Sequence, residues 1–167
     1  MPHYFKGPFT LGANLERIDA TAQYPLGTVA EGTEAGGTYA KYRYVKFVDA
    51  VTYVLGHSVS IASATTWDVT NDRAGGASIA RLETVGVVFQ TVVPTQNTFG
   101  WVQIAGIADV LVTGAAIIAG DYLMPAAATD GAAEEAVEGT DENILGVALA
   151  TIASAAVGKV MLMIRGA

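Results

Sequence analysis

Hydrophobic and polar residues alternate over short stretches of this chain, a pattern typical of β-strands. The clearest example is 159–165. One face of this segment carries the apolar residues Val160, Leu162 and Ile164. The other face carries Lys159, Met161, Met163 and Arg165. Because side chains on a strand point alternately to its two sides, we predict a strand whose even-numbered residues face inward.

Five further segments have strand features, namely 39–48, 65–70, 85–93, 99–112 and 144–151. In 39–48 the alternation changes phase, because Tyr42 and Tyr44 share one face while Val45 and Phe47 share the other. A bulge, or burial of both faces, would explain this change. Segment 99–112 has apolar residues of one parity on both sides of a glycine, which predicts a hairpin with its turn near Gly106.

No long helical pattern occurs, so the sequence predicts an all-β fold. We expect a compact sandwich or barrel of short antiparallel strands over 26–167, preceded by an extended N-terminal arm over 1–25. Three of the five prolines, Pro2, Pro8 and Pro25, lie in this arm. Proline cannot join a ladder or a helix interior. The arm also carries the aromatic residues Tyr4, Phe5, Phe9 and Tyr24. Such residues pack against the body or against a neighbouring subunit, and the sequence leaves both possibilities open.

Composition favours a protein that is part of an assembly. Hydrophobic residues make up 51% of the 167 residues and charged residues only 15%, below the ~25% usual in soluble domains. A well-filled monomeric core is the alternative.

The net charge of −7 opposes a phosphate-binding surface, so we expect no nucleic-acid partner. The longest uncharged stretch, 84–108, is interrupted by Gln90 and Pro94, so no membrane partner is expected.

Met161 and Met163 lie on the outward face of the strand predicted over 159–165. Methionine suits adaptable, partly buried contacts, so a seam between subunits is one interpretation. The other is a second core layer in a sandwich.

The sequence offers no catalytic constellation, and we predict neither an active site nor a cofactor. Cysteine is absent, and His3 and His57 are the two histidines. The chain has no Gly-x-Ser-x-Gly turn and no phosphate-binding loop. A hydrolase would have to combine His57 with Asp68 or Asp72. That is the enzymatic alternative.

Acidic residues gather late in the chain, with Asp121, Asp130, Glu134, Glu135, Glu138, Asp141 and Glu142 in one tract that contains no lysine or arginine. This composition predicts a solvated loop or hairpin tip. A calcium site is the alternative, but the spacing does not match an EF-hand, so we predict no metal site. Ahead of most of this tract, Gly120-Asp121 predicts a tight turn.

Several short motifs resemble one family when they are taken in order. They are Pro25-Leu26-Gly27-Thr28, Tyr42-Arg43-Tyr44-Val45-Lys46-Phe47, Gly100-Trp101-Val102-Gln103-Ile104-Ala105-Gly106, Gly120-Asp121-Tyr122-Leu123, Ile144-Leu145-Gly146-Val147-Ala148 and Gly158-Lys159-Val160-Met161-Leu162. Together they cover roughly residues 25 to 165. This order resembles the β-rich decoration, or cement, proteins of tailed-bacteriophage capsids.

The resemblance implies a non-enzymatic virion protein on the outer capsid surface, with the major capsid protein as its partner and a homotrimer as its state. Candidate contacts are Tyr4, Phe5 and Phe9 to the capsid, and Met161 and Met163 at the trimer seam. An acidic chain also fits the outer surface better than the side that faces packaged DNA. The alternative is a receptor- or carbohydrate-binding module of a head fibre or tail-associated protein, which would use exposed aromatic residues such as Trp67.

Overall fold

The computed structural model describes residues 14–33, 37–50, 52–63, 66–72, 83–90, 94–137 and 143–164. Within these ranges the regular secondary structure is entirely β, which confirms the predicted all-β class. The strands are β1 (Val29–Thr33), β2 (Tyr39–Phe47), β3 (Ser58–Ile61), β4 (Asp68–Thr70), β5 (Thr84–Val87), β6 (Thr98–Leu111), β7 (Tyr122–Pro125), β8 (Ala133–Glu135), β9 (Gly146–Ala148) and β10 (Val157–Met163). Neighbouring strands are antiparallel except β2 and β4, which pair in parallel.

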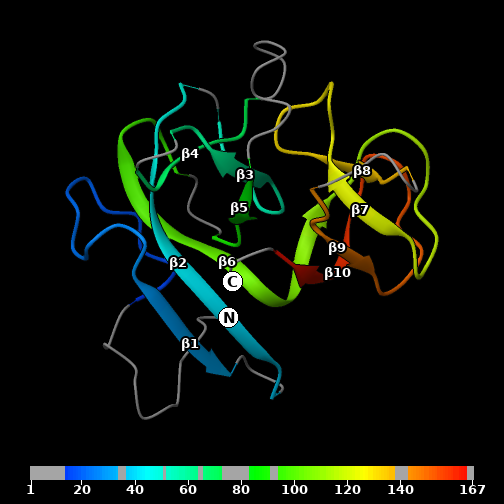
Figure 1. The fold of residues 1–167 in the computed structure, drawn as a ribbon, viewed down its shortest axis with the longest axis horizontal. Helices are drawn as coiled ribbons and strands as arrows, with labels where there is room; N and C mark the ends of the chain where they lie inside the picture. Colours follow the sequence, from blue (N-terminus) through cyan, green and yellow to red (C-terminus); the bar gives the residue numbers. More distant parts are fainter. Residues whose placement is uncertain are drawn as a thin grey trace.

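Five strands close into a barrel, which we call the first ring (Figure 1). Its order is β2-β4-β3-β5-β6, and the ring closes because β6 also pairs with β2. Residues at alternate positions of these strands, together with residues of the adjoining loops, fill its interior. They are Val45, Phe47, Tyr53, Val59, Val69, Val85, Val88, Val102 and Ile104. The predicted barrel is therefore present, although it uses only half of the strands.

The remaining strands form a second ring that shares β6 with the first. From β6 the order continues through β10, β9, β7 and β8. A bridge between Val112, just after β6, and Ala133 of β8 closes this ring. A separate core fills it, formed by Val87, Ala108, Val110, Val112, Ile117, Leu123, Ala133, Leu145, Ala148, Ile152, Val160, Leu162 and Ile164. In Figure 1 the two rings lie side by side, joined by β6.

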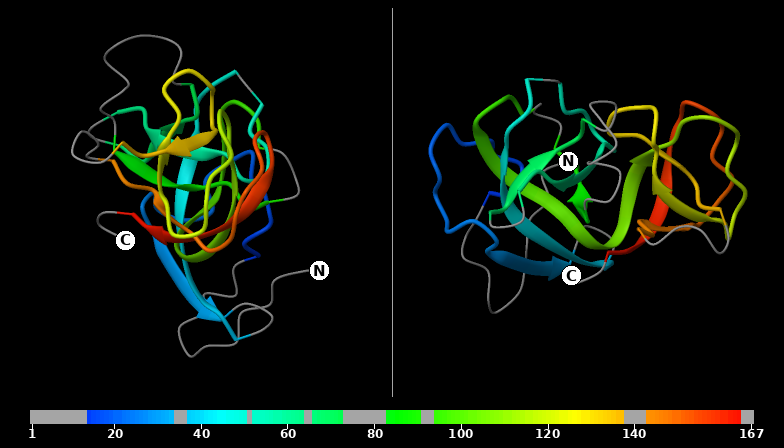
Figure 2. Two further views of the ribbon diagram at one scale, coloured as in Figure 1. Left: turned by 90° about the vertical axis from the view of Figure 1, so that its right-hand side faces the viewer. Right: turned by 45° about the horizontal axis from the view of Figure 1, so that its top comes forward.

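The predicted hairpin over 99–112 is wrong, because residues 99–111 belong to one strand of 14 residues. Gly106 has a positive φ of 93°, as a turn glycine would, but the two halves of the segment pair with β2 and with β10 rather than with each other. The strand bends at this point instead, as the curved course of β6 in Figure 2 shows. The side-chain amide of Gln103 donates hydrogen bonds to the carbonyl oxygens of Ala105 (3.2 Å) and Ile107 (3.0 Å). These two hydrogen bonds within β6 stabilise the bend. The strand pairs with β2 before the bend and with β10 after it.

An aromatic cluster covers the outer side of the first ring. Trp101 is its centre, with its ring 5.1 Å from that of Tyr44 and 5.4 Å from that of Tyr24. Tyr42 and Tyr44 are both fully buried here, while Val45 and Phe47 of the same strand are buried inside the ring. The change of phase in 39–48 thus reflects burial of both faces, and β2 also shifts register between Lys41 and Tyr42.

Residues 14–24 form the outer cover of this cluster. Leu15 is buried against it, and Asp19 exchanges two backbone hydrogen bonds of 2.8 Å with Phe99 of β6. The Tyr44 hydroxyl donates to the Asp19 carboxylate (3.0 Å) and accepts from the Gln23 amide (3.2 Å). Burial raises the pKa of Tyr44 to about 12, so its hydroxyl keeps the proton that it donates. The ring of Tyr24 contacts the rings of Tyr44 and Trp101, so Tyr24 packs against the body of its own chain.

Candidate interaction surface

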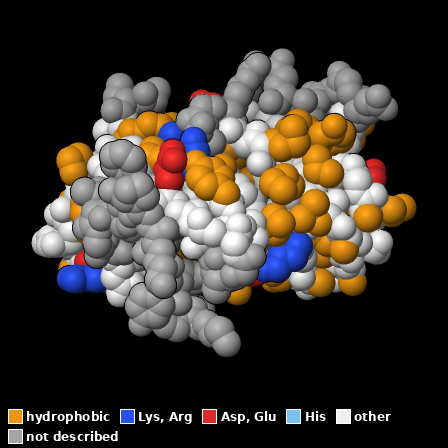
Figure 3. All heavy atoms as spheres, turned by 90° about the horizontal axis from the view of Figure 1, so that it is seen from below, with side chains coloured by type: hydrophobic (Ala, Val, Ile, Leu, Met, Phe, Trp, Pro, Cys, Tyr) orange, Lys and Arg blue, Asp and Glu red, His pale blue; other side chains and the backbone are white. Residues whose placement is uncertain are grey.

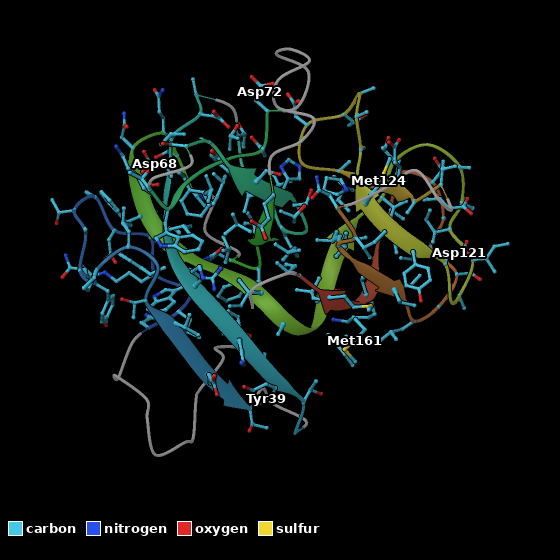
Figure 4. The ribbon with its side chains drawn as sticks, viewed as in Figure 1. Tyr39, Asp68, Asp72, Asp121, Met124 and Met161 are labelled. Atoms are coloured by element: carbon cyan, nitrogen blue, oxygen red, sulfur yellow. The ribbon has the colours of Figure 1, made fainter. Side chains whose placement is uncertain are left out.

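Met161 and Met163 lie on the outward face of β10, as the alternation predicts. Met161 is 39% exposed and Met163 53% exposed, while the intervening Leu162 belongs to the core of the second ring. Figure 4 shows the Met161 side chain directed away from the body below β10. The second-core-layer interpretation is therefore wrong for these two residues within the chain.

Strand register places Met161 in a row of apolar residues that crosses four strands. Met161 of β10 is opposite Ile107 of β6 on one side and opposite Val147 of β9 on the other. Val147 is in turn opposite Tyr122 of β7, which is 53% exposed. Residues that pair directly across strands point to the same side of a sheet. The row Ile107–Met161–Val147–Tyr122, with Met163 beside it, is called the apolar face below.

The apolar face is turned outward because the neighbouring positions of each strand fill the core. Ala108, Leu162, Ala148 and Leu123 each follow a residue of the row in sequence, and all four are buried in the second ring. Figure 3, which views the molecule from below, shows hydrophobic side chains gathered over this half of the surface. Exposed apolar residues that form a continuous group mark an interaction site more often than scattered ones do.

Two opposite charges next to the apolar face balance each other. On the same side of β6 and β10, Asp109 is opposite Lys159, and their side chains form an ion pair of 2.9 Å. The face thus combines exposed hydrophobic residues with a balanced pair of charges, in a chain whose net charge is −7.

The sequence pointed to Met161 and Met163 but missed Ile107, Val147 and Tyr122. Only Tyr122 had a usable signal in the sequence. It precedes the apolar Leu123, so in a strand the two side chains point to opposite sides. Tyr4, Phe5 and Phe9, the predicted capsid contacts of the arm, lie outside the described residues.

His57, the residue on which an enzymatic site would depend, lies where the two rings meet. Its ring packs on Gly131, so closely that a Cβ at Gly131 would lie 2.4 Å from His57 Cγ. Its Nδ1 is 2.9 Å from the side-chain amide nitrogen of Asn71. The neighbouring Ser58 hydroxyl donates to the carbonyl oxygens of Gly131 (3.2 Å) and Ala132 (3.5 Å). These contacts hold the loop between β7 and β8 against the first ring.

Asp68 and Asp72, the acidic partners considered for His57, are labelled in Figure 4 and lie apart from each other at the β4 side of the first ring. Asp68 begins β4, and the backbone amide of Asp72 donates to the Thr70 hydroxyl (3.0 Å). No hydrogen bond between either carboxylate and His57 is found among the described residues. His57 thus packs on Gly131 and lies within hydrogen-bond distance of Asn71, as a residue at a packing junction does.

Burial lowers the pKa of His57, against the opposing field of Asp130. A histidine with a lowered pKa in the folded state binds fewer protons than in the unfolded state as the pH falls below about 6.5. The free energy of unfolding should therefore decrease from about pH 7 to pH 5, with this residue adding a slope of at most about 1.4 kcal/mol per pH unit. We expect urea titrations of His57→Gln to show a smaller slope than those of the wild type. Identical slopes would contradict this role of His57.

Two carboxylates of the acidic tract accept hydrogen bonds from backbone amides. A Glu134 carboxylate oxygen accepts from the backbone amide of Ala127 (3.1 Å), and Asp121 accepts from that of Ile118 (2.8 Å) in the predicted turn at Gly120. Glu138, Asp141 and Glu142 lie outside the described residues. Among the residues that are described, no group of three or more His, Asp or Glu side chains is placed to hold a metal ion. That part of the chain also contains no helix long and apolar enough to cross a bilayer.

Trp67, the aromatic residue considered for carbohydrate binding, has close neighbours of its own. The Arg43 guanidinium carbon lies 4.3 Å from the centre of its ring. Gly27 lies so near the indole that a Cβ there would be 2.1 Å from Nε1.

Neither a protein-family model nor a curated protein sequence matches this chain. Among solved structures, the N base of the head fibre protein gp8.5 of bacteriophage phi29 is similar, with 13% sequence identity and a TM-score of 0.47. The match covers 73% of this chain and 94% of that one. A similarity of this degree carries no conclusion about the function or the partners of this chain.

Proposed function

We propose that this chain is a structural protein of a tailed-bacteriophage head, which binds the outer capsid surface and stabilises contacts between major capsid protein subunits. The observation that carries the proposal is the exposed apolar face on β6, β10, β9 and β7. Such a surface is typical of a subunit in an assembly. The order of sequence motifs that resembles capsid decoration proteins supplies the kind of assembly.

The proposal divides the contacts between two parts of the chain. Met161 and Met163 belong to the seam between copies in a homotrimer, whereas Tyr4, Phe5 and Phe9 bind the major capsid protein. Three copies joined in this way would carry three arms. Release then requires several weak contacts to break together, so a trimer resists internal pressure better than a single copy would.

The alternative, a carbohydrate- or receptor-binding module, has less support. Sugar rings stack on open aromatic faces, but the Trp67 indole already contacts the Arg43 guanidinium and lies against Gly27. The enzymatic alternative has less support again, since the described contacts of His57 and Ser58 are made to an amide and to backbone carbonyls. We therefore propose a protein that is not an enzyme.

The test is co-sedimentation of the purified chain with expanded capsids that lack it. We expect saturable binding at a fixed number of copies per capsid subunit, and capsids that survive a higher temperature when the chain is bound. Absence of binding would overturn the proposed function. Glycan-array binding by the same preparation would then favour the carbohydrate-binding alternative.

The role of the arm is tested with the triple variant Tyr4→Ala, Phe5→Ala and Phe9→Ala. We expect the variant to pellet with capsids at a lower occupancy than the wild type at equal free concentration. An unchanged occupancy would remove these three residues from the proposed capsid contact.

A further inference from the structure

We infer that the apolar face docks onto a second copy of this chain, with Tyr122, Val147 and Ile107 contributing to the contact together with the two methionines. This inference deepens the proposed function and rests on it for its biological setting. It extends the seam from one strand to four and names the surface that a neighbouring copy must meet.

The apolar face is a continuous row across four strands. Strands in a sheet lie about 4.8 Å apart, so a row across β6, β10, β9 and β7 is roughly 14 Å long. Its four residues come from positions far apart in the sequence, yet the strand register places them side by side. Partly buried and exposed side chains alternate along the row, since Ile107 and Val147 are partly buried while Met161 and Tyr122 are exposed. The row therefore has projecting side chains next to partly buried ones. Such a surface suits insertion between the side chains of another copy of the same row.

The charge of the chain limits which partner the apolar face can meet. Two copies with a net charge of −7 repel each other, so they can approach closely only where the local charge is balanced. At the β6 and β10 end of the apolar face this condition is met, because the charges of Asp109 and Lys159 balance each other in an ion pair. A nucleic acid or an anionic membrane would require excess lysine or arginine, which this face lacks. A second copy offers the same uncharged, apolar strip in return.

The side-chain types of the apolar face also favour contact with a protein. Methionine is flexible and adapts its shape to the partner, and tyrosine buries a large ring while its hydroxyl stays at the rim. Both are enriched at protein interfaces. Met161, Met163 and Tyr122 are the three most exposed members of the face.

The experiment is sedimentation velocity of the full chain, without capsids, over a wide micromolar range. We expect the wild type to sediment as a multiple of its 17.2 kDa mass and Met161→Lys to sediment as a single copy. Burying an unpaired ammonium group in the contact should weaken association at least about 100-fold. Val54→Lys is the matched control, since Val54 is 37% exposed and precedes β3 in the first ring. It should assemble like the wild type.

A second variant guards against a folding defect in the first. Tyr122→Lys alters the same row from β7, and its tryptophan fluorescence should match that of the wild type while association is lost. A wild type that sediments as a single copy throughout would overturn the inference. So would assembly of both lysine variants, including the case in which they lose only capsid binding, because the face would then belong to the capsid contact. Wild-type assembly without capsid binding would support this inference and overturn only the proposed function.

Discussion

Replacing Gly106 by alanine is expected to lower the free energy of unfolding by about 3 kcal/mol or more. Gly106 has a φ of 93°, a conformation that costs a residue with a Cβ about 1–2 kcal/mol of folding free energy. In addition, a Cβ would lie 2.3 Å from the carbonyl oxygen of Tyr39 and 3.1 Å from Ala40 Cα. The backbones of β2 and β6 would have to separate there, which adds a cost of the kind measured for overpacked cores. Urea unfolding followed by tryptophan fluorescence measures the difference.

Gly120→Ala is the control for this prediction. Gly120 has nearly the same φ, 96°, but no heavy atom lies within 4 Å of a Cβ placed there. It should therefore lose only about 1–2 kcal/mol, the cost of the backbone conformation. Equal losses in the two variants would show that the contact with Tyr39 does not matter.

Replacing Trp101 by alanine is expected to lower the free energy of unfolding by about 3–5 kcal/mol. This is the range for replacing a large aromatic residue in a core by alanine. Trp101 is only 1% exposed and contacts both Tyr24 and Tyr44. The cavity would also remove the surface on which residues 14–24 lie. We therefore expect faster cleavage by trypsin after Arg17, together with a lower midpoint in urea. The remaining tryptophan, Trp67, reports the unfolding.

Tyr44→Phe separates the two parts of this prediction. The variant keeps the aromatic packing but loses the hydrogen bonds to Asp19 and Gln23. It should lose about 1–2 kcal/mol and show an intermediate rate of cleavage. If Trp101→Ala leaves cleavage at Arg17 unchanged, the segment is held by Asp19 and Phe99 rather than by the aromatic cluster.

Local patterns in the sequence predicted most individual strands. The alternation over 159–165 gave the correct inward and outward faces of β10, because each residue there has a one-sided environment. The double burial of β2 was visible as a change of phase at Tyr44 and Val45. Gly106 misled the prediction because a positive φ occurs both in turns and in bends within a strand. The partners of β6 on each side decide between the two, and they lie far away in the sequence.

The candidate surface was predicted only in part for the same reason. Met161 stood out because its own strand is regular. Val147 and Tyr122 join it through pairings of β9 with β10 and β7, which no local pattern contains. The two-ring arrangement was not predicted either, since the bridge between Val112 and Ala133 that closes the second ring depends on the fold as a whole. The contacts assigned to Tyr4, Phe5 and Phe9 stay predictions.

A strand common to both rings has a consequence for how the molecule opens. Neither ring can lose β6 without exposing the core of the other, so both should unfold in one cooperative transition rather than as independent units. The amide protons in the middle of β6 should then be the slowest in the chain to exchange with deuterium, at a rate set by global unfolding. The chain thus gains the cooperativity of a single domain although its core is divided between two rings of strands.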